Sequence, residues 1–175
     1  MDQPLSAGMI VCVGSDLRGS YVMKSTVLAA VATIALVAGT AAADQFDAVL
    51  GARQGLMSNL AFNMAPLGAM VKGEAPYSAD RAKMLATNLQ SLSQVNLSEY
   101  WPKGTDNVAL VDRTAALPAI WESGSKIGEK VTALKAAMAD LAKEAGNGPD
   151  ALKTSFTAAG KSCGGCHTDY RQKQN

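Results

Sequence analysis

Apolar residues recur every third or fourth position along four stretches of the chain, and this period predicts four amphipathic helices. The first stretch covers about residues 45–72. Its apolar stripe is interrupted by one charged residue, Arg53, and it contains Pro66, which we expect to kink the helix or remove one hydrogen bond. The second stretch begins after Ser78, a suitable N-cap residue, and fades near Asn96.

The third and fourth stretches lie in the C-terminal part of the chain. The third starts near Pro118 and ends at residues 146–148, and the fourth opens with Pro149. A loop of about twenty residues precedes the third stretch, and loops of that length are often functional. Because there is no strand-like alternation and the other connections are short, the sequence predicts an all-α fold, an antiparallel up-down-up-down four-helix bundle.

A continuous apolar run of 13 residues, 27–39, precedes the first predicted helix. A membrane-spanning helix needs about 20 such residues, so this run is short for a bilayer. Lys24 lies before the run and Ala41-Ala42-Ala43 after it, as in a secretory signal peptide with its cleavage site. We therefore predict that residues 1–43 are absent from the mature protein, with either Met1 or Met23 as the start of translation. The alternative is an uncleaved membrane anchor.

Composition narrows the possible functions of the remaining residues, 44–175, which are long enough for one domain. The full chain has 16 Lys and Arg against 15 Asp and Glu, which argues against nucleic acid as a partner. It has three Cys and one His, and Cys12 would leave with the signal peptide. A structural zinc site needs about four nitrogen or sulfur ligands, so zinc is excluded by number.

Residues 163–167 read Cys-Gly-Gly-Cys-His, the attachment signature of c-type haem. On a helix, the sulfurs of Cys163 and Cys166 point the same way and can bond to the two vinyl groups along one porphyrin edge. His167 follows directly and can turn its imidazole under the iron. Gly164 and Gly165 each weaken a helix by about 1 kcal/mol relative to Ala, which is easier to explain if a large bound group holds the segment.

Two other interpretations of the cysteine pair fit the sequence less well. A disulfide would close a very small loop and stabilise little. A thiol oxidoreductase would place its Cys pair after a strand in a βαβ unit, whereas this pair lies near the end of an all-helical chain. The only His already belongs to the motif, so no nucleophile and base pair is visible, and we predict that the protein is not an enzyme.

The segment Cys163–Arg171, near the C-terminus of an exported four-helix chain, resembles the cytochrome c′ family. The resemblance covers residues 44–175, with supporting matches at residues 52–54, 72–77, 101–105 and 118–121. It implies one haem c per chain, bound covalently through Cys163 and Cys166, with His167 as the proximal iron ligand. It also implies a bacterial periplasmic protein, free of the membrane in its mature form, and a homodimer.

Further site residues follow from the same resemblance. Arg171 matches a basic residue beside the proximal His, where it would modulate the imidazole and the approach of small ligands. Arg53 and Gln54 match a pair near the haem propionates, and a charge on an apolar stripe needs such a partner unless it reaches solvent. Thr114 is a further residue expected to touch the haem.

Met57, one turn after Arg53, decides between two functions. In most members of the family an apolar or aromatic residue here blocks the distal face of a five-coordinate iron, whereas in a low-spin subgroup Met is the sixth ligand. Ligation predicts electron transfer with small redox proteins, and a merely blocked site predicts binding of nitric oxide or carbon monoxide. The remaining interpretation is that Met57 fills the core, as we expect of Met64, Met70, Met84 and Met138.

Overall fold

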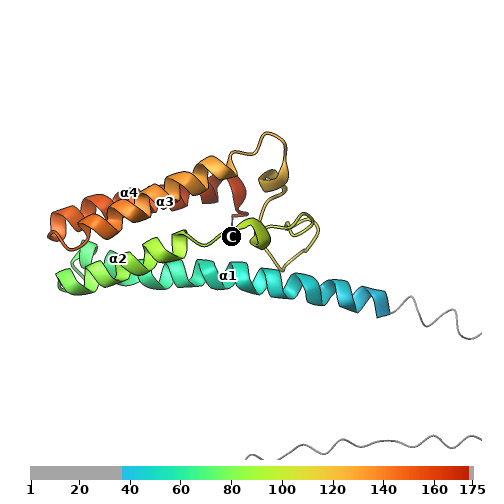
Figure 1. The fold of residues 1–175 in the computed structure, drawn as a ribbon, viewed down its shortest axis with the longest axis horizontal. Coiled ribbons are helices and arrows are strands. Elements are labelled where there is room, and N and C mark those ends of the chain that lie inside the picture. Colours follow the sequence, from blue (N-terminus) through green and yellow to red (C-terminus); the bar gives the residue numbers. More distant parts are fainter. Residues whose placement is uncertain (1–36, 174–175) are drawn as a thin grey trace, which may run out of the picture.

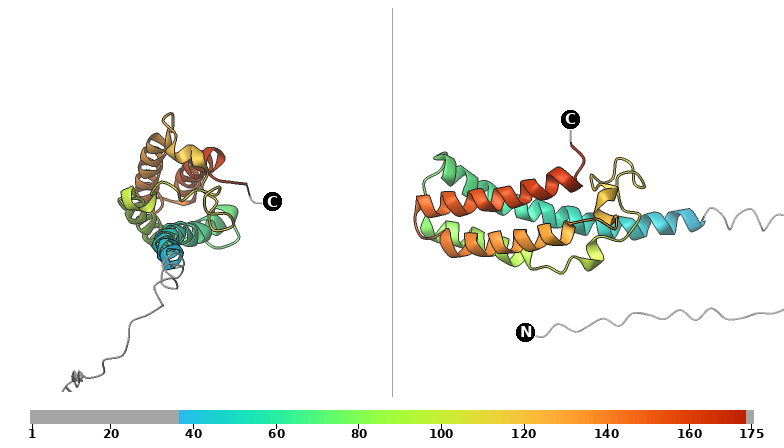
Figure 2. Two further views of the ribbon diagram at one scale, coloured as in Figure 1. Left: turned by 90° about the vertical axis from the view of Figure 1, so that its right-hand side faces the viewer. Right: turned by 90° about the horizontal axis from the view of Figure 1, so that it is seen from above.

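The computed structural model describes residues 37–173, with side chains from residue 46 onward. Its helices are α1 (Val37–Lys72), α2 (Ala79–Ser93), α3 (Ile127–Glu144) and α4 (Pro149–Tyr170), and they run alternately up and down in one bundle (Figures 1 and 2). Between residues 37 and 173 no β-strand forms, apart from a single bridge between Ala116 and Arg171. The predicted all-α four-helix bundle is therefore confirmed.

The predicted signal peptide lies almost entirely outside the described residues, as do Met23 and Cys12. The helix α1 begins at Val37, so its backbone includes the last residues of the predicted leader. It continues through Pro66 without a break in the helix. In the part of the chain that the structure describes, no helix combines the length and apolarity needed to cross a membrane.

The main core lies where all four helices face one another, and its largest fully buried side chains include Leu67, Leu89, Met138, Leu141 and Leu152. In the sequence, Leu89 belongs to the apolar stripe Leu85–Leu89–Leu92 of the second stretch, and Leu141 belongs to the stripe Leu134–Met138–Leu141 of the third, so the apolar period located these helix faces correctly. Met84 was expected to fill the core, but its side chain is 54% exposed. The prediction is wrong because Met84 lies one residue before Leu85, and successive residues of a helix point about 100° apart.

Ser78 and Tyr77 make hydrogen bonds that hold the end of the bundle opposite the long loop. The Ser78 side chain accepts a hydrogen bond from the Arg81 amide at 3.4 Å, as an N-cap residue does. The Tyr77 hydroxyl donates to the Ala145 carbonyl at 3.0 Å and accepts from the Gly148 amide at 2.9 Å. Tyr77 therefore ties the α1–α2 turn to the α3–α4 turn.

The third helix does not start where the sequence predicted. Pro118–Trp121 forms a separate 3-10 helix, η2, and α3 begins only at Ile127. The indole N–H of Trp121 donates to the Trp101 carbonyl at 2.9 Å, so η2 is held by the loop and not by α3. The loop therefore spans residues 94–126 and contains a second 3-10 helix, η1 (Ser98–Tyr100).

Candidate functional site

The Cys-Gly-Gly-Cys-His motif occupies the last turns of α4, at the end of the bundle that carries the long loop (Figure 1). The two cysteines are half-buried and lie against different apolar clusters. Cys163 packs against the main core, whereas Cys166 packs against a second cluster built from the loop and the end of α4 (Ala116, Ile120 and Tyr170, with Trp101, Ala119, Trp121 and Ile127). Both thiols thus face the inside of the bundle, as the spacing of three residues predicts.

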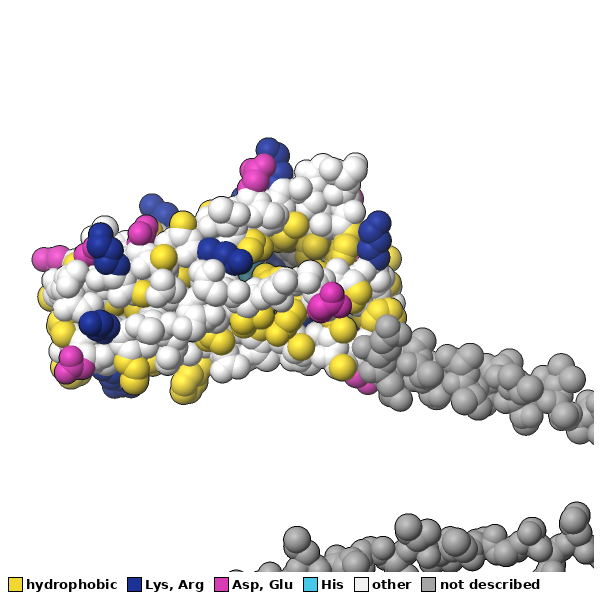
Figure 3. Space-filling view, in the orientation of Figure 1, with side chains coloured by type: hydrophobic (Ala, Val, Ile, Leu, Met, Phe, Trp, Pro, Cys, Tyr) yellow, Lys and Arg dark blue, Asp and Glu magenta, His cyan; other side chains and the backbone are white. Residues whose placement is uncertain are grey.

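An apolar pocket of about 350 Å³ opens beside this second cluster and is lined by Leu97, Trp101, Ile120, Trp121, Ile127, Gly128 and Val131. Four of these residues belong to the cluster that contacts Cys166. Figure 3 shows hydrophobic side chains gathered around a hollow near the loop end of the bundle. A Cβ built at Gly128 would meet no other atom within 4 Å, so the wall is open there. An uncharged, aromatic-lined pocket beside a half-buried cysteine fits a flat apolar cofactor attached to that cysteine.

The acidity of the two thiols argues against thiol redox chemistry. Burial raises the pKa of the Cys163 thiol. Burial also raises the pKa of the Cys166 thiol, although the positive charge of Lys130 opposes the shift. Reactive cysteines of thiol–disulfide enzymes have lowered pKa values, because the thiolate is the nucleophile. The environment of this pair therefore favours the protonated, unreactive form.

His167 is exposed at the end of α4. Partial burial and the charge of Arg171 both lower the pKa of its imidazole, so the neutral form, which binds metals, is favoured near pH 7. The backbone amide of Arg171 donates to the His167 carbonyl at 3.2 Å. Arg171 is also one partner of the β-bridge to Ala116, so the loop restrains the chain immediately after the histidine.

Arg53 is one of the most enclosed polar residues of the described chain, at 5% exposure, so the alternative that it reaches solvent is wrong. All its N–H groups point to neutral oxygens of the loop: the Tyr100 carbonyl (2.8 and 3.0 Å), the Thr105 carbonyl (3.1 Å) and hydroxyl (2.7 Å), and the Thr114 hydroxyl (3.4 Å). The guanidinium also lies 4.0 Å from the ring centre of Trp101, a wall of the pocket. Burial lowers its pKa. Arg53 thus joins α1 to the loop that covers the apolar pocket.

Gln54 and Thr114 meet Arg53 at this junction. The Gln54 amide donates to the Arg113 carbonyl at 2.9 Å, and Thr114 accepts from Arg53 and from the Ala116 amide. Three residues assigned to the site by resemblance are therefore brought together by the structure. Their contact with haem propionates stays a prediction.

The sequence did not predict how the long loop and the C-terminal segment contact each other around the site. The Tyr170 carbonyl accepts from the Leu117 amide at 3.0 Å, and the Gln172 amide donates to the Ala115 carbonyl at 2.8 Å. Trp101 and Trp121 pack with ring centres 6.2 Å apart and form much of the pocket wall. Their importance could have been suspected from the sequence, because they are its only two tryptophans.

Met57 lies on α1 one turn beyond Arg53 and is 37% exposed. By contrast, Met70 and Met138 are buried in the main core, and Met64 packs against it. Met57 belongs to neither apolar cluster. Core filling therefore does not account for the thioether at this position.

Replacing Arg53 by Leu is expected to lower the free energy of unfolding by about 2–4 kcal/mol, because buried loop oxygens lose their donors. Denaturant unfolding followed by circular dichroism measures this loss. Arg81→Leu, at an exposed position on α2, is the matched control and should change stability by about 0.5 kcal/mol or less. Equal stabilities of the two variants would show that the Arg53 contacts contribute nothing.

Comparisons by sequence and by structure find relatives of the same kind. A family described as cytochrome C' matches residues 48–171. A cytochrome c-554 from Cereibacter sphaeroides is 37% identical over 144 residues, which cover 81% of this chain and 94% of the relative. The structure of cytochrome c' from Rhodobacter Spheriodes is similar with a TM-score of 0.70 at 37% identity, covering 73% of this chain and 98% of that one. A ferrous variant of cytochrome c prime from Alcaligenes xylosoxidans with bound NO has a TM-score of 0.63 at 26% identity, covering 72% and 94%.

Proposed function

This chain belongs to the cytochrome c′ family, and from that premise we propose that it is a periplasmic electron carrier with His167 and Met57 as the axial ligands of its haem. As a c-type cytochrome it carries haem c covalently, through Cys163 and Cys166. The bound haem supplies a one-electron iron couple, whose potential is raised by a thioether ligand. The chain's own residues decide which ligands reach the iron.

The placement of Met57 is the observation that carries the proposal. Met57 and Arg53 share one face of α1, and Arg53 contacts Trp101 on the wall of the apolar pocket. The thioether is only partly covered, although neighbouring positions of the same stripe pack into the core. A cofactor in the pocket would give this side chain a burial partner that the polypeptide does not supply.

The other site residues have supporting roles in this proposal. A neutral His167 imidazole would bind the iron on the proximal side, and Arg171 would favour that neutral form. Arg53, with Gln54 and Thr114, would approach the haem propionates. The contact from Arg53 to Thr114 is the longest of its hydrogen bonds, at 3.4 Å, so a carboxylate could replace it at the smallest loss.

We also propose a homodimer through the outer faces of α1 and α2. Phe62 on α1 is 73% exposed and Met84 on α2 is 54% exposed, so both helices present a large apolar side chain outside the bundle. Burial of such residues favours association. Sedimentation analysis of the exported protein tests this, and Phe62→Ser with Met84→Ser should shift it to monomer.

The second candidate is a five-coordinate protein that binds nitric oxide or carbon monoxide. The NO complex of cytochrome c prime from Alcaligenes xylosoxidans favours it, because that protein shares this fold. In this case Met57 would cover the ligand-binding side of the haem without binding the iron, and the haem would supply the site for a diatomic ligand. The two candidates use the same pocket and differ only in whether the thioether binds iron.

A visible absorption spectrum of the exported protein, oxidised and reduced, separates the candidates. We expect a low-spin spectrum, with the long-wavelength charge-transfer band of methionine sulfur on ferric iron, and no binding of carbon monoxide by the reduced protein at moderate concentration. A high-spin spectrum with ready carbon monoxide binding would replace the electron carrier by the gas-binding protein.

A further inference from the structure

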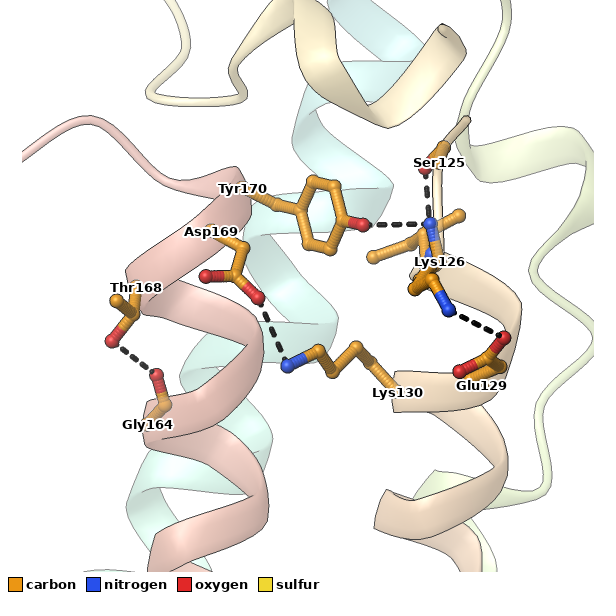
Figure 4. A network of polar contacts seen from close by, with 9 residues as sticks. Ser125, Lys126, Glu129, Lys130, Gly164, Thr168, Asp169 and Tyr170 are labelled. Atoms are coloured by element: carbon orange, nitrogen blue, oxygen red, sulfur yellow. Dashed lines mark hydrogen bonds and ion pairs between the residues drawn. The ribbon is translucent and has the colours of Figure 1, made fainter. Parts of the chain in front are cut away.

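Lys130 reaches from α3 to α4 at the level of the haem-attachment motif (Figure 4). Its Nζ atom lies 2.9 Å from the Oδ2 atom of Asp169, and the two side chains are 33% and 48% exposed. A Cβ built at Gly165 would lie 3.8 Å from the same ammonium group. The positive charge therefore lies against the backbone of the motif, and the negative charge lies two residues beyond His167.

Neighbouring contacts hold this ion pair in place. The backbone amide of Lys126, just before α3, donates to the Tyr170 hydroxyl at 2.8 Å (Figure 4). Tyr170 is itself buried in the cluster that contacts Cys166. The start of α3 is thus fixed to the end of α4 about one helical turn before Lys130. The hydrogen bond to Asp169 also raises the pKa of Lys130, which keeps the ammonium charged.

We propose that Lys130 and Asp169 are opposed charges that each shift the reduction potential of the haem carried on α4, with Lys130 raising it and Asp169 lowering it. Reduction adds one electron to the cofactor, so a nearby ammonium stabilises the reduced state and a nearby carboxylate stabilises the oxidised state. In the parent protein the two effects largely cancel, because the ion pair keeps the charges close together. The inference requires the covalent haem of the proposed function, but not ligation by Met57.

Removing one charge at a time tests the proposal in the haem-loaded protein. Lys130→Met keeps much of the aliphatic side chain and should lower the potential, whereas Asp169→Asn should raise it. For such partly screened charges we expect the ratio of reduced to oxidised protein at fixed ambient potential to change about twofold to tenfold. A tenfold change corresponds to about 59 mV for a one-electron couple. The double variant should return to within about twofold of the parent.

Matched variants separate the effect of a lost charge on the reduction potential from the effect of changed packing. Lys143→Met removes an equivalent ammonium at the far end of α3, where it pairs with Glu144 at 3.5 Å, and should leave the potential unchanged. Lys130→Arg and Asp169→Glu retain the charges and should stay near the parent. Thermal unfolding by circular dichroism identifies any variant whose fold has changed.

The proposal would be overturned if both single variants shifted the potential in the same direction. It would also be overturned if neither variant shifted it. Higher ionic strength should reduce each shift, because both side chains are partly in solvent. The absorption spectrum of the same samples reports ligation separately. A high-spin parent with opposite shifts in the two variants would reject Met57 as ligand and retain the charge pair.

Discussion

Replacing both Cys163 and Cys166 by alanine is expected to abolish covalent haem attachment completely. Each thiol supplies one thioether, and His167 alone leaves only a dissociable bond to iron. The mass of the denatured protein should equal that of the bare polypeptide, and acid extraction should remove all colour. Without a cofactor the apolar pocket beside Cys166 stays unfilled, so the midpoint of thermal unfolding should also fall.

Cys12→Ala is the matched control for this experiment, because Cys12 lies before the predicted mature chain whether translation starts at Met1 or at Met23. The exported control should keep its covalent haem, its colour and a mature N-terminus at Asp44. Retention of haem on the denatured double variant, or its loss from the control, would contradict the assignment of the two attachment residues.

Replacing Met57 by leucine is expected to convert the haem from low-spin to high-spin. Leucine has a similar volume, so the fold should lose less than about 1.5 kcal/mol of stability, but it has no sulfur to bind iron. The ferric charge-transfer band should disappear, and the reduced variant should bind carbon monoxide where the parent does not. The reduction potential should fall, because a thioether ligand raises it.

Met64→Leu is the corresponding control on the same α1 stripe. Met64 packs against the main core, so its replacement should leave spectrum and potential as in the parent. If Met57→Leu and the parent give the same spectrum, the thioether is not a ligand and the gas-binding candidate takes its place.

Local patterns were enough to predict the parts of the fold that depend on helix geometry. The apolar period located the buried faces around Leu89 and Leu141, and Ser78 was identified as a cap from its type and position. The spacing of Cys163 and Cys166 placed both thiols on the inner side of α4. These features involve neighbours three or four residues apart, so a short stretch of chain contains the information.

Contacts between distant segments were not predictable in this way. Pro118 suggested a helix start, but the Trp121 contact with Trp101 holds that segment in the loop as η2. Arg53 was expected to need a partner for its charge, and the structure supplies neutral loop oxygens from residues up to 61 positions away. No local pattern specifies which loop atoms will meet a given helix residue.

The sequence by itself determined the four-helix fold and the attachment of haem to α4, because both depend on periodicity and on one five-residue motif. Only the tertiary structure decided what surrounds that motif: the tryptophan-lined pocket, the anchoring of Arg53 and the ion pair from Lys130. The physical reason is that these contacts join the motif and α1 to the long loop and α3. Their geometry is set by how the helices pack, and not by the residues adjacent in the chain.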